Sequence, residues 1–226
     1  MIPNINKFPI IILSSVRTGS SALFDELANQ YPHLQKFSEP IHALKTANIE
    51  NFKNTIFTTT NFLIKVHAYD LFKGRDINKS HPATLASIEK IKEFLNNNST
   101  VIRIRRKNVI DQIASYHYAS QNNIFAVTKA DEEYKYLVAG DQNSFIDKIP
   151  ALEIQHGEVL NTIDLVKRHN QATDNIPFPI HYDLYYEDCN FTNTRLVKTP
   201  IPDNYEKLKN LIKVLLSHEE TRLTRD

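Results

Sequence analysis

The segment from Phe8 to Leu23 constrains the fold more than any other part of this chain of 226 residues. It begins with an apolar run, passes through a short loop rich in hydroxyl side chains, and then enters a helical pattern. In α/β proteins a strand, a tight loop and a helix in this order bind phosphate-like anions, because the loop N–H groups and the helix N-terminus point at the ligand. We therefore expect an anion site in this loop, formed by Arg17, Thr18, Gly19, Ser20 and Ser21.

The loop differs from that of a nucleoside triphosphatase. Those loops read G-x-x-x-x-G-K-[ST], whereas this chain has neither the first glycine nor the lysine. Arg17 supplies the positive charge instead. The segment from Arg17 to Ser21 resembles the loop that holds the 5'-phosphosulfate in sulfotransferases that use 3'-phosphoadenosine 5'-phosphosulfate (PAPS).

Size, charge and cysteine content exclude several classes of protein. The length suits a single domain, residues 1–226, and a net charge of +1 gives no support to a nucleic-acid partner. The single cysteine, Cys189, excludes an internal disulfide and a cysteine-based zinc site. The apolar run Ile10–Leu13 is too short to span a membrane, and no segment reads as a targeting signal. We therefore expect a cytoplasmic protein without a membrane span.

Strands alternate with helices along the chain. Hydrophobic patterning predicts strands at Pro9–Leu13, Phe62–His67, Thr100–Arg106 and Pro177–Tyr186. It predicts helices at Ser20–Gln30, from Pro82 onward, at Asn108–Ser120, over most of Ala130–His169, and at Tyr205–Ser217. This alternation indicates the α/β class, in a three-layer P-loop-like fold with a central parallel sheet flanked by helices.

A second group of basic and hydroxyl side chains follows the strand that ends near Arg106. Open α/β sheets bind ligands at the carboxyl ends of their strands, which is where Arg105, Arg106 and Lys107 lie. Ser115 lies about two turns into the next helix. The segment resembles the sulfotransferase motif that clamps the 3'-phosphate of PAPS. The resemblance assigns that phosphate to Arg106 and Ser115, while Arg105 and Lys107 stay open as alternatives to Arg106.

Three further residues suit proton transfer and charge stabilisation. Lys65 and His67 share one face of a predicted strand, so both can reach one ligand, and a neutral imidazole can accept a proton from an alcohol. Cytosolic sulfotransferases have a similar Lys-x-His, with the histidine as base. The Ser38-Glu39-Pro40 segment resembles the Glu-Pro of the bacterial carbohydrate sulfotransferases (trehalose and nodulation-factor type), whose glutamate is the base. Glu39 is therefore the favoured base, and His67 remains the alternative.

The resemblance extends from Ile10 to about Asp188. Near its end, Tyr186-Glu-Asp188 resembles the sulfotransferase segment whose tyrosine lies near the adenine. The resemblance implies sulfuryl transfer from PAPS, with 3'-phosphoadenosine 5'-phosphate (PAP) as product, to a hydroxyl on a small molecule or oligosaccharide, and it implies no metal. Arg17 and Lys65 would stabilise charge. A P-loop kinase that uses ATP and Mg²⁺, or an inactive nucleotide-binding protein, are the alternatives.

Overall fold

The computed structural model describes residues 4–40, 47–72, 82–97, 99–122, 124–130, 133–138, 145–146, 151–192, 194 and 201–223. Within these ranges it describes only the backbone at 47–51, 82–85, 97, 124–130, 133–138, 145–146 and 219–223. The chain divides into two compact units: Met1–Lys107 with Arg168–Thr194, and Asn108–Lys167 with Arg195–Asp226.

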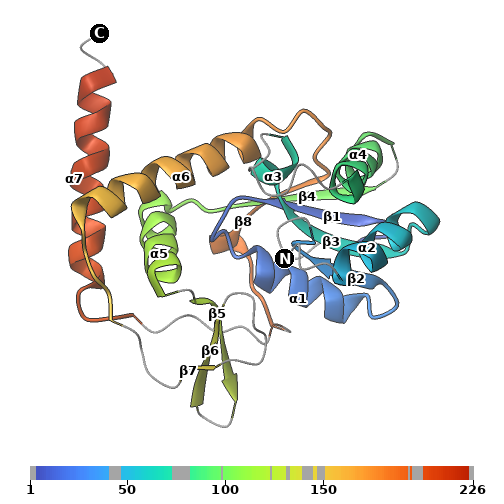
Figure 1. Ribbon diagram of the computed structural model, residues 1–226, viewed down its shortest axis with the longest axis horizontal. Helices are drawn as coiled ribbons and strands as arrows, with labels where there is room; N and C mark the ends of the chain where they lie inside the picture. The colour runs from blue at the N-terminus through green and yellow to red at the C-terminus, as the bar shows by residue number, and fades with distance from the viewer. Residues whose placement is uncertain are drawn as a thin grey trace. The chain divides into compact units, whose positions relative to one another are not determined.

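The first unit is built on a parallel sheet of five strands (Figure 1). The strands are β1 (Ile10–Ser14), β2 (Gln35–Ser38), β3 (Phe62–His67), β4 (Thr100–Arg105) and β8 (Tyr182–Tyr185). Their order across the sheet is β2-β3-β1-β4-β8, and every neighbouring pair is parallel. The protein is thus α/β with a central parallel sheet flanked by helices, as the sequence predicted, and it is compatible with a three-layer P-loop-like fold.

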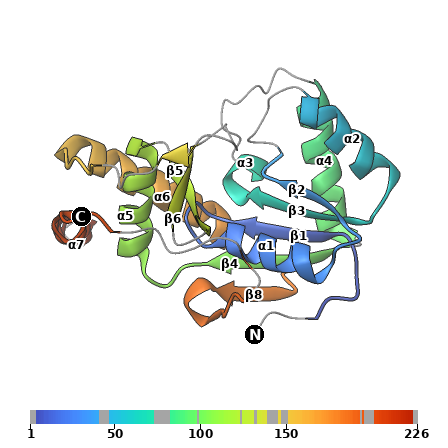
Figure 2. The ribbon, with the colours of Figure 1, turned by 90° about the horizontal axis from the view of Figure 1, so that it is seen from below.

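Two separate hydrophobic cores cover the two faces of this sheet. Ile10 and Ile12 of β1 pack with Leu23 and Leu27 of helix α1 (Ser20–Gln30). The alternate residues of β1 point the other way, because successive strand side chains face opposite sides. They pack with α2 (Ala47–Thr58) and α4 (Pro82–Asn97), which lie side by side (Figures 1 and 2), through Ile11, Leu13, Phe52, Ile56, Ile91 and Leu95.

Since the five strands are parallel, their carboxyl ends share one edge of the sheet. The loop after β1, the residue after β2, and the ends of β3, β4 and β8 therefore gather there. A short helix, α3 (Ala68–Phe72), follows β3, and a 3₁₀ turn at Tyr186–Asp188 follows β8. This is the edge at which open α/β sheets bind ligands.

The second unit is described by itself. It contains α5 (Val109–Asn122), most of α6 (His156–Asp174) and α7 (Tyr205–Leu223). It also contains a three-stranded antiparallel sheet of β5 (Ile124–Ala130), β6 (Glu133–Val138) and β7 (Phe145–Ile146), in that order. Among the described residues of either unit, no helix combines the length and the apolar character needed to cross a bilayer.

Two expectations about secondary structure were wrong in part. The segment from Ala130 onward was expected to be mostly helical, but residues 133–138 and 145–146 are strands. Their sequence, Glu-Tyr-Lys-Tyr-Leu-Val, alternates polar residues with aromatic and aliphatic ones, a pattern that favours a strand. The last parallel strand was expected at Pro177–Tyr186, but it covers Tyr182–Tyr185. Its beginning is shorter because Pro177 and Pro179 lack the N–H group that a strand ladder needs.

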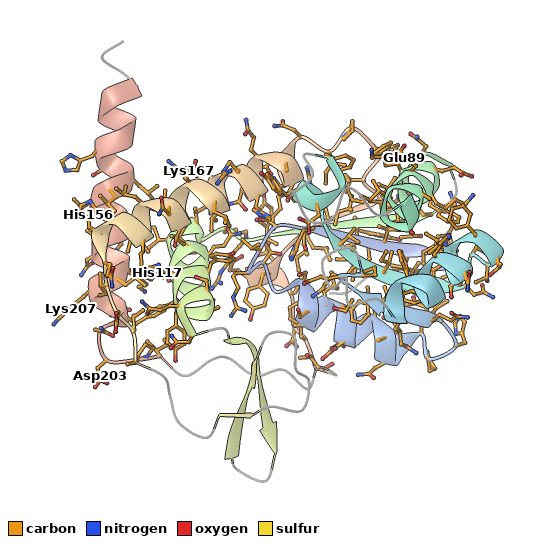
Figure 3. All side chains as sticks on the ribbon, viewed as in Figure 1. Glu89, His117, His156, Lys167, Asp203 and Lys207 are labelled. Atoms are coloured by element: carbon orange, nitrogen blue, oxygen red, sulfur yellow. The ribbon has the colours of Figure 1, made fainter. Side chains whose placement is uncertain are left out.

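His117 lies buried on α5 in the second unit (Figure 3). Its Nδ1 is 3.1 Å from the Thr162 hydroxyl, and its Nε2 is 3.4 Å from the Glu153 carbonyl oxygen. Burial lowers the pKa of His117 below its ordinary value of 6.5 and outweighs the opposing effect of the Glu153 carbonyl. Near this pH, the His117 imidazole therefore binds a proton less readily in the folded protein than in the unfolded chain.

This difference predicts that stability falls in mild acid. As the pH drops below about 6.5, the unfolded chain binds a proton at His117 before the folded chain does, so the free energy of unfolding decreases. Above that pH both states are neutral at this site and the contribution of His117 is fully present. Urea unfolding from about pH 7.5 to about pH 5 should show a smaller decrease for His117→Gln than for the wild type. Equal slopes for the two proteins would contradict the assignment.

Candidate active site

The loop after β1 has the backbone conformation of an anion-binding turn. Arg17 and Gly19 have left-handed φ angles of 55° and 76°, and Thr18 between them does not. Backbone that alternates in this way turns successive N–H groups toward one side and makes a concave site for an anion. The Thr18 hydroxyl donates to the Ser15 carbonyl oxygen at 3.1 Å, so it braces the loop. Ser20, which is 6% exposed, begins α1.

Backbone strain coincides with two of the residues that the sequence singled out. Among the described residues, the non-glycine residues with positive φ are Arg17, at 55°, and Glu39, at 51°. A left-handed conformation costs a residue with a side chain about 1–2 kcal/mol, and such strain clusters at functional sites. This conformational cost therefore falls on Arg17, in the loop after β1, and on Glu39, the residue expected to be the base.

Glu39, Lys65 and His67 form one cluster at the ends of β2 and β3. The Glu39 N–H donates to the Lys65 carbonyl oxygen at 2.8 Å, which extends the β2–β3 ladder by one bond and fixes the position of Glu39. Lys65 Nζ lies 2.7 Å from Glu39 Oε1, and His67 Nε2 lies 3.3 Å from the same oxygen. Neither contact uses Oε2, the second carboxylate oxygen of Glu39.

The cluster is bonded to the β1 end and to α1. Lys65 Nζ donates to the Ser21 hydroxyl at 2.7 Å, so one ammonium group joins the first turn of α1 to Glu39. On the other side, His67 Nδ1 is 3.2 Å from the Ser14 hydroxyl. The site thus brings together the first loop, the Glu-Pro segment and the Lys-x-His segment, which are far apart in the sequence.

Burial and charge distinguish the three members of the cluster. The side chains of Lys65 and His67 are 3% and 11% exposed, whereas that of Glu39 is 27% exposed. Burial raises the pKa of Glu39, but the positive charge of Lys65 and the contact with His67 more than offset this effect and hold the pKa well below its usual range. Glu39 is therefore ionised at neutral pH, and it is the member most accessible to a ligand.

His67 contacts an aromatic pair, His169 and Tyr69, that the sequence did not indicate. The ring of His169 meets it edge-on at 6.0 Å between centroids, and Tyr69 stacks on His169 at 4.4 Å. Position 169 lies about a hundred residues from His67, and its place in a helix gave no sign of this contact. Ser14, His67 and Glu39 are the residue types of a serine-hydrolase triad, but the two ring nitrogens are exchanged, with Nδ1 facing the serine and Nε2 facing the carboxylate. The Ser14 side chain is also fully buried, so it has no access to a substrate as a nucleophile.

Arg105 ends β4, and Arg106 and Lys107 follow it; of these three basic residues, Arg106 has the longest contact with a carboxylate. Arg105 binds Asp183 at 2.7 Å and Asp174 at 3.3 Å, and Lys107 binds Asp188 at 2.6 Å. The contact between Arg106 Nε and Glu187 is 3.7 Å, longer than a hydrogen bond. A second nitrogen of Arg106 donates to the Arg17 carbonyl oxygen at 3.4 Å, so Arg106 lies beside the first loop.

Tyr186 lies against the same loop. A Cβ added at Gly19 would lie 2.0 Å from Tyr186 Cδ2, so the ring packs directly on the glycine. The Arg106 guanidinium is 5.6 Å from the centre of this ring, and Phe191 stacks on the ring at 5.8 Å. The sequence signalled Tyr186 through its Tyr-Glu-Asp segment, but it gave no sign of Phe191 or of the pairing of Glu187 with Arg106.

Ser115, the expected partner of Arg106 at the 3'-phosphate, lies on α5 in the second unit, whereas Arg106 belongs to the first. In the part of the chain that the structure describes, no three His, Cys, Asp or Glu side chains gather as a metal site would require. No protein-family model matches the chain, and no curated protein matches it.

Proposed function

We propose that this protein is a sulfotransferase that moves a sulfuryl group from PAPS to a hydroxyl group, with a carbohydrate as acceptor and the cytoplasm as location. One observation carries the proposal. The buried ammonium of Lys65 lies 2.7 Å from the Ser21 hydroxyl at the anion loop and 2.7 Å from the Glu39 carboxylate. The group that would stabilise charge on a leaving oxygen is thus bonded to the group that would accept the acceptor's proton.

The same contact favours transfer without Mg²⁺. In nucleoside triphosphatase loops, the Ser or Thr two residues after the last glycine binds Mg²⁺ through its hydroxyl. Ser21 stands two residues after Gly19, and here its hydroxyl accepts a hydrogen bond from Lys65. The hydroxyl that would bind Mg²⁺ in such a loop is thus bonded to the Lys65 ammonium. This arrangement suits an enzyme that neutralises negative charge with its own side chains.

The residues of the first unit can be assigned to each part of the reaction. Arg17 and the loop N–H groups would hold the anion, and Lys65 would face the oxygen on which negative charge grows. The acceptor oxygen bonds to sulfur as the bond from sulfur to the phosphate oxygen breaks, and the electron pair of that bond stays on the phosphate. The proton of the acceptor hydroxyl goes to Glu39, whose ionised carboxylate is 27% exposed.

A kinase is the second candidate, because Lys65 also reaches the loop from which the usual lysine is missing. Thermal-shift measurements with PAP, ATP with Mg²⁺, and AMP separate the candidates, since a ligand of the folded state raises the melting temperature. We expect the largest increase with PAP, followed by transfer from PAPS to a member of a panel of sugars. Preference for ATP with Mg²⁺ would favour the kinase, and PAP binding without any transfer would indicate an inactive nucleotide-binding protein.

Replacing Arg106 with alanine tests the assignment of the 3'-phosphate. Loss of one charge-assisted contact costs about 1.5–3 kcal/mol, so PAP should bind roughly one to two decades more weakly. Adenosine 5'-phosphosulfate lacks the 3'-phosphate and should be little affected. Calorimetric titration of both ligands measures the difference.

Lys107→Ala is the matched control for Arg106→Ala, because Lys107 is adjacent in sequence and its ammonium is already bound to Asp188. It should leave the affinity for PAP nearly unchanged. Equal weakening of both nucleotides by Arg106→Ala, or a larger effect from Lys107→Ala, would move the 3'-phosphate away from Arg106.

A further inference from the structure

Lys65 carries one positive charge that two acceptors share. Its side chain is 3% exposed, and its ammonium group donates to the Ser21 hydroxyl and to Glu39 Oε1, both at 2.7 Å. Ser21 lies in the first turn of α1, which begins at the anion loop. A negatively charged group bound at this loop would therefore compete with Glu39 for the same cation.

The shared cation matters because Glu39 is a weak base while Lys65 is bound to it. Among the described residues, the charged or titratable side chains that act on Glu39 are Lys65 and His67, both on β3. Burial alone would raise the pKa of Glu39, and these two neighbours lower it. Any change that withdraws Lys65 from Glu39 makes the carboxylate more ready to accept a proton.

We infer that Lys65 couples the two halves of the site: an anion bound at the loop draws the ammonium away from Glu39 and turns that carboxylate into a stronger base. This inference rests on the proposed function and adds an order of events to it. Nucleotide binds first, and the base becomes competent only when the group to be transferred is in place. Before that, Glu39 is held by Lys65 and does not activate an acceptor hydroxyl.

The coupling has a consequence for binding that does not depend on turnover. If Glu39 competes with the bound anion for Lys65, removing its charge should strengthen nucleotide binding. Glu39→Gln keeps the size of the side chain, and we expect it to bind PAP roughly tenfold more tightly than the wild type at about pH 7.5. A purely structural role for Glu39 would give unchanged or weaker binding.

Glu89→Gln is the matched control for the loss of one negative charge. Glu89 lies on α4 in the same unit (Figure 3), is exposed, and pairs with Lys92. It should change the affinity for PAP less than twofold. Tightening by Glu39→Gln but not by Glu89→Gln would locate the effect at the shared cation rather than in the net charge of the protein.

Proton exchange gives a second test. Calorimetry in two buffers with different ionisation enthalpies, at about pH 5.5, measures the protons taken up when PAP binds. The wild type should take up more protons than Glu39→Gln, and the phosphates of PAP contribute equally to both. Adenosine 5'-phosphosulfate has no ionisation of its sulfated phosphate in this range, and it should still cause proton uptake by the wild type.

This measurement needs only the wild-type protein, so it does not depend on whether the variant folds.

The outcomes separate this inference from the proposed function. If Glu39→Gln fails to tighten PAP binding, or if it exchanges as many protons as the wild type, the coupling through Lys65 is wrong while PAP binding still stands. If neither protein binds PAP at all, the proposed function itself fails.

Discussion

Replacing Glu39 with glutamine is expected to lower the rate of sulfuryl transfer about 10²- to 10⁴-fold, the usual contribution of a general base. The amide keeps the shape of the side chain but has no ionised oxygen with which to take the proton of the acceptor hydroxyl. Because the Glu39 side chain is 27% exposed and glutamine has nearly the same size, the substitution should leave the protein folded. Turnover with PAPS and an acceptor found by screening measures the loss, and a melting curve checks the fold.

His67→Gln is the comparison that decides between the two candidate bases. Both ring nitrogens of His67 are already in contact, Nδ1 with Ser14 and Nε2 with Glu39, so we expect it to position Glu39 rather than to contact the acceptor. The loss of turnover should then be about tenfold or less, since this variant keeps the carboxylate that accepts the proton.

The pH profile adds a readout that a merely structural role would not change. Activity should fall as the pH drops through the pKa of Glu39 in the complex, because the base must be ionised. Removing His67 removes one of the groups that lower this pKa, so the acid limb should move to higher pH in His67→Gln. A larger loss in His67→Gln than in Glu39→Gln, with no shift of the limb, would make His67 the base.

Local sequence determined much of the fold. The predicted bounds Ser20–Gln30 and Phe62–His67 are those of α1 and β3. The helix has a clear hydrophobic period and a stop at Tyr31-Pro32, and the strand is a short, nearly continuous apolar run of the kind expected in a buried parallel sheet. Strand β7 was missed because a strand of two residues has no period to read. Strand β6 has six residues with an alternating pattern, and it was missed because the whole segment Ala130–His169 was taken as mostly helical.

The residues of the candidate site were easier to predict than their contacts. Lys65 and His67 were singled out together, as residues of one strand face, whereas Glu39 was singled out from a separate motif, as the competitor of His67 for the role of base. Their union depends on the register of β2 against β3, in which Ser38 pairs with Lys65 and places Glu39 beside the end of β3. Such register is a property of the assembled sheet, and no pattern within either strand specifies it.

The contact between Gly19 and Tyr186 is a second example of a contact that local sequence does not specify. Gly19 was expected to form part of the anion site, and its φ of 76° is a backbone conformation that favours glycine. What the sequence did not indicate is that Tyr186 fills the space where a side chain would be. The two positions lie on neither the same strand nor neighbouring strands, so their contact depends on how the turn after β8 meets the loop after β1.

Gly19→Ala should therefore have the largest effect on stability of any small substitution in the loop. An alanine at φ 76° costs about 1–2 kcal/mol, and displacing the Tyr186 ring adds about 1–3 kcal/mol of overpacking. The free energy of unfolding should fall by the sum of the two, and PAP binding should be lost because the loop N–H groups no longer converge. Urea unfolding and titration with PAP measure the two effects.

The chain supplies a matched control and a way to separate the two costs. Gly157, near the start of α6, has no heavy atom within 4 Å of an added Cβ, so Gly157→Ala should lose no stability and can gain up to about 1 kcal/mol.

In a Tyr186→Ala background, Gly19→Ala should cost about 1–3 kcal/mol less than in the wild type, since the ring it would strike is gone. Strict additivity of the two substitutions would mean that the ring does not rest on the glycine, and PAP binding that survives Gly19→Ala would mean that the anion does not depend on the left-handed turn.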